Sequence, residues 1–279
     1  MTLQPYLFSS DSSLVAALGG SGPDRVGGVV VDWERHGKLE RQAGARERIG
    51  VDTQINEEGP EELMEVSSIA KVPVLCRLNH WTSKSPEELE TAIACGASEV
   101  LLPIVRTTEE VEAALDAARG RVGVGIMVET IEATRIADLL GEMPITRAFL
   151  GLMDLALERR SVSIFDAIAD GTVERVRSSF EVPFGFAGLT VPGGGRPIPV
   201  HLLAGEMVRL GCEFSFLRRS FIGDSGDAPV PGLRSIMTMV EHLESRSLGE
   251  IDDDYRDLIA TLNGQPRAEL RSPAPRESG

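Results

Sequence analysis

Eight short apolar runs, separated by segments of helical pattern, constrain the fold of this chain more than any other feature. The runs are "PYLF" (5–8), "GGVVVDW" (27–33), "VPVLCRL" (72–78), "SEVLLPIV" (98–105), "VGVGIMVE" (122–129), "RAFLGLM" (147–153), "FGFAGLTV" (184–191) and "EFSFLRR" (213–219). Such continuous runs are typical of strands buried on both faces, as in a parallel sheet covered by helices. The rhythm predicts a (β/α)8 barrel, with a doubly wound sheet as the alternative.

The segments between the runs carry helix start and stop signals. In 85–97, Ser85 is the expected cap, Pro86 suits the first helical position and Gly96 follows the last apolar residue. Segment 107–120 places two acids in its first turn, where the helix dipole favours them. These signals support strand–helix alternation.

Length and charge bound the class of protein. The 279 residues predict a single barrel domain over 1–262, followed by a mobile tail over 263–279 that is rich in Pro, Arg and Ser. A net charge of −15 argues against nucleic acid or an anionic membrane as partner. The N-terminus has no signal-peptide pattern and no run has the length of a membrane span, so we expect a cytoplasmic protein.

Two carboxylates stand where neighbouring strands end. Glu129 closes the fifth run and Asp154 follows the sixth. In a parallel barrel both strand ends lie on the same rim, where two acids would repel each other unless a cation lies between them. The pair therefore predicts a Mg²⁺ or Mn²⁺ site, since these ions prefer carboxylate oxygens and keep positions open for substrate. The alternative is that each acid caps a helix or pairs with an arginine.

Arg77 lies near the end of the third run and is expected at the same rim. A guanidinium beside a metal can hold a substrate carboxylate through two parallel hydrogen bonds, whereas an ion pair to Glu99 or Glu129 is the alternative. A 2-oxo acid would suit such a site, because a metal ion polarises its ketone and stabilises the enolate. The backbone N–H groups of Met153 and Asp154 are further candidates for binding its carboxylate.

Proton transfer needs a partner, and His36 is the candidate. It follows a strand end, and a water bound to the ion is the alternative base. A Schiff-base route needs a lysine in the barrel mouth, and of Lys38, Lys71 and Lys84 only Lys38 follows a strand end, at an expected helix start. We therefore favour the metal route.

Two further features lie on the expected mouth. The glycine-rich segment 191–201 follows the seventh run and is read as a mouth loop, with phosphate binding as the alternative. Arg218 and Arg219 end the eighth run and are candidates for contact with an anionic group on a second substrate.

These motifs together resemble the HpcH/HpaI aldolase family, the pyruvate-class aldolases and citrate lyase β-subunit relatives, over roughly residues 5–222. "VVVDWERHGKLERQ" is similar to the family's Asp-x-Glu segment, "CRLN" to its Arg-x-Asn strand and "GASEVLLPIVRTTEEV" to its Gly-Ala-Asp…Leu-Pro…Glu-Glu-Val stretch. "MVET" and "GLMDLAL" resemble its metal-binding Glu and Asp segments.

The resemblance implies a barrel of the phosphoenolpyruvate/pyruvate-domain type, with Mg²⁺ or Mn²⁺ on Glu129 and Asp154 and a pyruvate-like group on Arg77. It also implies a homo-oligomer, often a trimer or hexamer. Three departures stand out. Arg35 occupies the place where the family's aldolases commonly carry His, Met153 replaces a smaller or polar residue, and the His-Pro motif of the acyl-CoA lyases is not apparent.

The sequence thus predicts a metal-dependent aldolase that joins a 2-oxo acid, pyruvate or oxaloacetate, to an aldehyde or cleaves that bond. Two alternatives remain open. One is a citrate-lyase-like acyl-CoA lyase or thioesterase, and the other is a non-catalytic barrel that acts as a binding partner.

Overall fold

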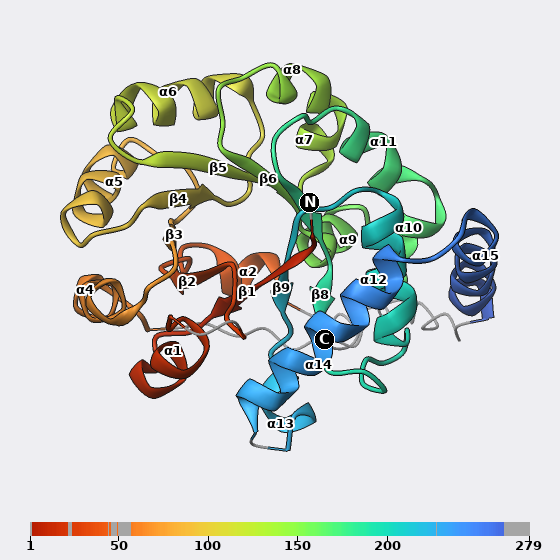
Figure 1. Ribbon diagram of the computed structural model, residues 1–279. Coiled ribbons are helices and arrows are strands. Elements are labelled where there is room, and N and C mark those ends of the chain that lie inside the picture. The colour runs from red at the N-terminus through yellow and green to blue at the C-terminus, as the bar shows by residue number, and fades with distance from the viewer. Residues whose placement is uncertain are drawn as a thin grey trace, which may run out of the picture.

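All described strands run parallel and wrap into a barrel (Figure 1). The computed structural model describes residues 2–21, 24–43, 45, 49, 57–226 and 228–264. The strands are β1 (Gln4–Phe8), β2 (Gly28–Asp32), β3 (Val74–Arg77), β4 (Glu99–Leu102), β5 (Gly123–Val128), β6 (Arg147–Leu150), β7 (Phe184–Phe186), β8 (Gly188–Leu189) and β9 (Phe214–Leu217). Their order is β7-β6-β5-β4-β3-β2-β1-β9-β8.

The barrel closes through a strand that is broken in two. Only Ala187, with a φ of +54°, separates β7 from β8. β7 pairs with β6, where Phe149 lies opposite Gly185, and β8 pairs with β9, where Gly188 lies opposite Phe216. The two pieces form the seventh strand and β9 the eighth. The predicted (β/α)8 barrel is therefore confirmed, with its strands on the eight apolar runs.

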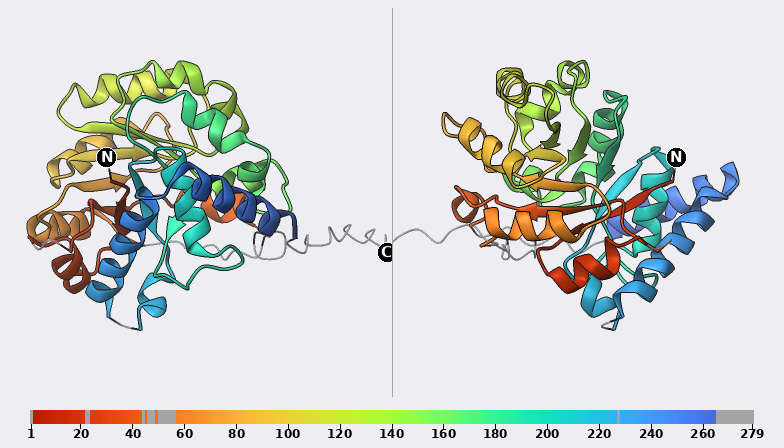
Figure 2. Two further views of the ribbon diagram at one scale, coloured as in Figure 1. Left: turned by 45° about the vertical axis from the view of Figure 1, so that its right-hand side comes forward. Right: turned by 60° about the vertical axis from the view of Figure 1, so that its left-hand side comes forward.

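The helices lie mainly around the outside of the barrel (Figure 2). They are α1 (Ser12–Leu18), α2 (Lys38–Arg41), α4 (Pro60–Ile69), α5 (Ser85–Ala94), α6 (Thr108–Ala118), α7 (Ile131–Arg135), α8 (Ala137–Gly141), α9 (Leu152–Glu158), α10 (Asp166–Ala169), α11 (Thr172–Ser178), α12 (Val200–Arg209), α13 (Phe221–Asp224), α14 (Pro229–Glu244) and α15 (Leu248–Gly264). Within the described part of the chain, no helix has the length and apolar character to cross a membrane. Of the expected tail 263–279, residues 265–279 lie outside the described residues.

Local signals set the helix starts. Thr107 caps α6 in a capping box with Glu110, as side chain and backbone of each residue bond to the other. The expected cap at Ser85 is wrong by one position, because α5 begins at Ser85 and Lys84 is its N-cap. The Ser85 hydroxyl instead accepts a hydrogen bond from the Thr82 amide at 2.8 Å, which fixes the turn before the helix.

A cluster of aromatic and aliphatic side chains fills the barrel interior. Because side chains alternate across a strand, every second residue points inward. Phe216 of β9 packs against Phe149 of β6 at 4.3 Å and Phe8 of β1 at 4.6 Å between ring centres. The buried interior residues are Tyr6, Val30, Leu75, Leu101, Met127, Phe149, Phe214 and Phe216. This layer is the floor on which the next inward-facing residues stand, at the carboxyl ends of the strands.

Candidate active site at the barrel mouth

Polar side chains replace the apolar ones one step above the aromatic floor. Asp32 and Arg77 are the last residues of β2 and β3, and Glu129 directly follows β5. Each lies two residues beyond an inward-facing apolar residue, namely Val30, Leu75 and Met127, so it has the same inward orientation. The carboxyl ends of barrel strands are where such enzymes place their chemistry.

Arg77 is held by two carboxylates. Its Nε and Nη2 donate to the two oxygens of Asp32 at 2.8 and 2.6 Å, and its Nη1 lies 3.3 Å from Glu34. The guanidinium carbon stands 4.9 Å from the centre of the Phe8 ring, a cation–π contact with the floor. The pairing expected as the alternative, to Glu99 or Glu129, does not occur, since Glu99 pairs with Arg147. Burial opposes the charge on Arg77, but Asp32 and Glu34 outweigh it and raise the Arg77 pKa.

The segment around α2 adds two more cations. Lys38 is only 3% exposed, and its Nζ lies 3.4 Å from Asp32 and 3.2 Å from Glu34. Arg41 pairs with Glu34 through Nη2, and its Nε lies 3.5 Å from Asp154. An ammonium bound to two carboxylates is not a free amine nucleophile, so the ion pairs of Lys38 agree with a route that needs no Schiff base.

Glu129 is fixed by backbone groups from two neighbouring loops. Its side chain is buried, and Oε1 accepts the amide of Ile104 at 2.9 Å. Ile104 has a φ of +55°, a conformation that β-branched residues rarely adopt. The other carboxylate oxygen of Glu129 lies against Gly151, where an added Cβ would stand 2.2 Å from Oε2. The carboxylate is therefore oriented from both sides.

Asp154 lies in the first turn of α9, whose N-cap is Gly151. Its Oδ2 accepts a hydrogen bond from Gln42 at 2.9 Å, and its Oδ1 faces Arg41. Arg41 and Asp154 are 113 positions apart in the sequence, yet the α2 segment and α9 bring them together over the mouth. For Asp154 to bind a cation, these two contacts must open.

Among the residues that the structure describes, this cluster brings together the carboxylates of Asp32, Glu34, Glu129 and Asp154 and the cations of Lys38, Arg41 and Arg77. Burial and the charges of Asp154 and Glu34 raise the pKa of Glu129 to about 8. Burial also raises the Asp154 pKa, with a further contribution from Glu34 that opposes Arg41. In contrast, Arg77 and Lys38 overcome burial and keep the pKa of Asp32 and Glu34 low. The carboxylates whose charged form is disfavoured are therefore Glu129 and Asp154.

The residues present fit a divalent cation there. Glu129 and Asp154 offer hard oxygen donors, and a dication beside them would stabilise the charged carboxylates that burial and neighbouring negative charge disfavour. Among the residues that the structure describes, no group of three or more His, Cys, Asp or Glu side chains is placed to hold a metal. A site of two carboxylates suits Mg²⁺, which commonly binds one or two carboxylates and keeps water or substrate oxygens as its other ligands.

Two other expected residues lie nearby. The His36 side chain is exposed, while its amide donates to Asn79 Oδ1 at 2.9 Å. The amides of Met153 and Asp154 belong to the first turn of α9, where no carbonyl of the same helix can accept them. Their assignment as base and as carboxylate-binding amides stays a prediction.

Sequence reasoning missed the roles of several residues. Arg41 and Gln42 gave no local signal, because their partner Asp154 is distant in sequence. Asp32 and Glu34 stood in a recognised motif, but their pairing with Arg77 was not expected. The contacts of Gly151 and Ile104 with Glu129 depend on the tertiary structure and have no signal in the sequence around either residue.

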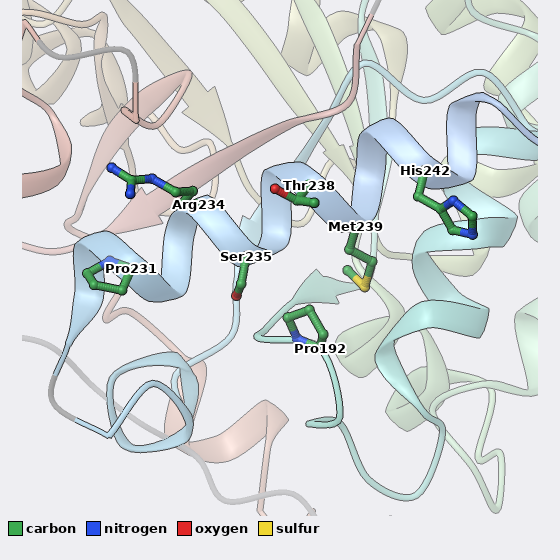
Figure 3. Close-up of a pocket in the computed structure, with 7 residues that line it drawn as sticks. All are labelled: Pro192, Pro231, Arg234, Ser235, Thr238, Met239 and His242. Carbon is green, nitrogen blue, oxygen red and sulfur yellow. The ribbon is translucent and has the colours of Figure 1, made fainter.

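An apolar pocket lies elsewhere, beside α14 (Figure 3). Its volume is about 560 Å³, and it is lined by Pro192, Pro231, Arg234, Ser235, Thr238, Met239 and His242. None of these residues is a carboxylate, so this pocket offers no site for the expected cation.

The fold and the mouth thus define a (β/α)8 barrel with a buried charge cluster at the carboxyl ends of its strands. No family model matches the chain, and no curated protein matches it. Solved structures do. RipC from Yersinia pestis has 13% identity and a TM-score of 0.53, covering 89% of this chain and 98% of its own. A mutant tryptophan synthase alpha-subunit from Pyrococcus furiosus has 12% identity and a TM-score of 0.55, covering 87% and 97%.

A tryptophan synthase structure from M. tuberculosis is similar too, with 14% identity, a TM-score of 0.52 and coverage of 88% and 92%. At these identities the likeness shows the fold alone. Since barrels of this kind host many chemistries, function must be argued from the mouth. Membership of the HpcH/HpaI family stays a prediction.

Proposed function

We propose that this protein is a divalent-metal-dependent aldolase that forms or cleaves the bond between a 2-oxo acid enolate and an aldehyde. The observation that supports the proposal is the proximity of two buried carboxylates at the mouth, since burial and the charge of Asp154 raise the pKa of Glu129 to about 8. Mg²⁺ or Mn²⁺ would be held by these two carboxylates. When bound, the ion would polarise the ketone of the oxo acid and stabilise its enolate.

The protein's own residues would bind the substrate carboxylate and carry the proton. Asp32 binds Nε and Nη2 of Arg77, which leaves Nη1 for a substrate carboxylate in exchange for its contact with Glu34. The Met153 and Asp154 amides, in the first turn of α9, would add hydrogen bonds to the same group. His36, exposed at the rim and held by Asn79 through its backbone, is the proposed proton carrier.

Binding of the cation would replace the contacts of Arg41 and Gln42 with Asp154. Both side chains come from one short segment, so they can withdraw together without disturbing the strands. Arg41 keeps its partner Glu34 when this happens. The charge cluster would therefore keep most of its ion pairs when the cation binds.

Exchange of pyruvate methyl protons with D₂O, followed by ¹H NMR, tests the proposal without any knowledge of the aldehyde. We expect exchange with Mg²⁺ or Mn²⁺ and none after EDTA. Glu129→Gln and Asp154→Asn should each abolish exchange and weaken Mn²⁺ binding. Glu206→Gln, which changes a buried carboxylate of α12 away from the mouth, is the control and should retain both.

The two alternatives give different results. An acyl-CoA lyase or thioesterase would release a CoA product from an acyl-CoA substrate. A non-catalytic barrel would keep the contacts of Arg41 and Gln42 with Asp154 and would neither bind Mn²⁺ nor exchange pyruvate protons. Absence of exchange with every 2-oxo acid tried, at saturating Mn²⁺, would refute the aldolase proposal.

A further inference from the structure

Arg218 is a second arginine on the inner side of the barrel mouth. It follows β9, and its amide donates to the Leu189 carbonyl at 2.7 Å, which continues the ladder between β8 and β9. Phe214 and Phe216 point into the barrel interior, so Arg218, two residues further along, has the same orientation. It stands above the aromatic floor as Arg77 does.

The glycine opposite makes room for this side chain. A Cβ at Gly188 would lie 3.0 Å from Arg218 Cγ, which is tighter than ordinary contact. The Gly188 carbonyl also accepts a hydrogen bond from Arg218 Nε at 3.0 Å. The stem is therefore held in place while the two terminal nitrogens remain for other partners.

Those terminal nitrogens have no carboxylate within ion-pair distance among the residues described here, in contrast to Arg77 and Arg41. The nearby Asp224 is occupied by the hydroxyls of Thr190 and Ser220, at 2.5 and 2.7 Å from its Oδ2. Burial lowers the pKa of Arg218, although Asp224 opposes the shift. Arginine nevertheless keeps its charge in proteins, so Arg218 is a half-buried cation that makes no direct ion pair with any of the described carboxylates.

β9 lies on the side of the mouth away from Glu129. From β5, the barrel order passes β6 and the β7/β8 strand before it reaches β9, and four strands lie between them in the other direction. A substrate held at Glu129 and Asp154 would therefore extend toward Arg218 with its far end.

We propose that Arg218 binds an anionic group at the far end of the aldehyde partner, so that the aldehyde is one that carries a carboxylate or a phosphate. This rests on the proposed aldolase function. Both groups match the planar guanidinium through two parallel hydrogen bonds. Arg218 thereby selects a charged over an uncharged aldehyde of the same length.

Matched aldehyde pairs test this selection in aldol addition to pyruvate with Mn²⁺. The pairs are 4-oxobutanoate with butanal, for a carboxylate, and glyceraldehyde 3-phosphate with glyceraldehyde, for a phosphate. The wild type should prefer the charged member of at least one pair, and the preferred pair identifies the group. Arg218→Gln should lower kcat/KM for that charged aldehyde about 10- to 100-fold, and Arg218→Lys should lower it less.

Arg219, the other arginine that the sequence suggested for this contact, is exposed, whereas Arg218 is half-buried and directed into the mouth. We therefore assign the contact to Arg218 alone and use Arg219→Gln as the control, since it changes the net charge equally and should keep the preference. Urea unfolding of each variant verifies that it is folded. A preference that survives Arg218→Gln, or that Arg219→Gln removes equally, would overturn the role of Arg218, as would a wild type without any preference.

Failure of the aldolase proposal would be recognised separately, because pyruvate exchange needs no aldehyde. If the wild type shows no exchange, calorimetric titration with succinate and with inorganic phosphate tests anion binding at Arg218 independently of catalysis. Binding of either anion that is lost in Arg218→Gln and kept in Arg219→Gln would support the anion site. Equal binding to all three proteins, or binding to none, would overturn it.

Discussion

Replacing Gly151 by alanine should displace Glu129 and weaken metal binding. The added Cβ would lie 2.2 Å from Glu129 Oε2 and 2.8 Å from its Cβ. To restore ordinary contact, the carboxylate must move by about 1 Å or more. Such a movement would break its 2.9 Å hydrogen bond with the Ile104 amide. The backbone at Gly151, with a φ of −82°, is one that alanine adopts readily, so the effect is steric only.

The magnitude follows from overpacking and from the loss of an orienting contact. Inserting a methyl group into a packed region costs roughly 1–3 kcal/mol in the free energy of unfolding. Loss of the groups that orient a metal ligand weakens metal affinity by about 10- to 100-fold. We expect both effects in Gly151→Ala, measured by urea unfolding without metal and by calorimetric titration with Mn²⁺.

Gly249→Ala is the matched control, since an added Cβ in that part of α15 meets no atom within 4 Å. It should keep the wild-type Mn²⁺ affinity and be as stable as the wild type or slightly more so. If Gly151→Ala bound Mn²⁺ as tightly as this control does, Glu129 would not be a ligand oriented in the way described here.

Two further predictions concern the same carboxylate. Because the Glu129 pKa is raised from 4.5 to about 8, folded metal-free protein keeps a proton that the unfolded chain releases, so stability should fall as pH rises between these values. Urea unfolding of the wild type and Glu129→Gln from pH 5 to pH 8 should show this extra loss of stability in the wild type only. Saturating Mn²⁺ should reverse the loss. Parallel stability curves for the two proteins would contradict the raised pKa. At Ile104, the φ of +55° predicts that Ile104→Gly is more stable than Ile104→Ala by about 1 kcal/mol, the reverse of the usual order, and a more stable alanine variant would rule out the left-handed backbone.

The sequence by itself determined the strands and the place of the two acids. Continuous apolar runs such as 98–105 leave little choice but a buried parallel strand, and the end of such a run marks the rim of the barrel. Glu129 and Asp154 could thus be predicted to share a rim, because strand order and strand direction are enough to bring them there. No finer geometry was needed for that step.

Tertiary structure alone decided which partner each of these side chains has. Arg77 pairs with Asp32, 45 residues away, and Arg41 reaches Asp154 across 113 residues, distances over which no local pattern can act. The left-handed backbone of Ile104 opposes its own residue type and persists because the surrounding packing and the Glu129 hydrogen bond maintain it. Local propensity sets strands and helices, whereas the pairing of buried charges depends on which side chains the closed barrel brings within a few ångströms.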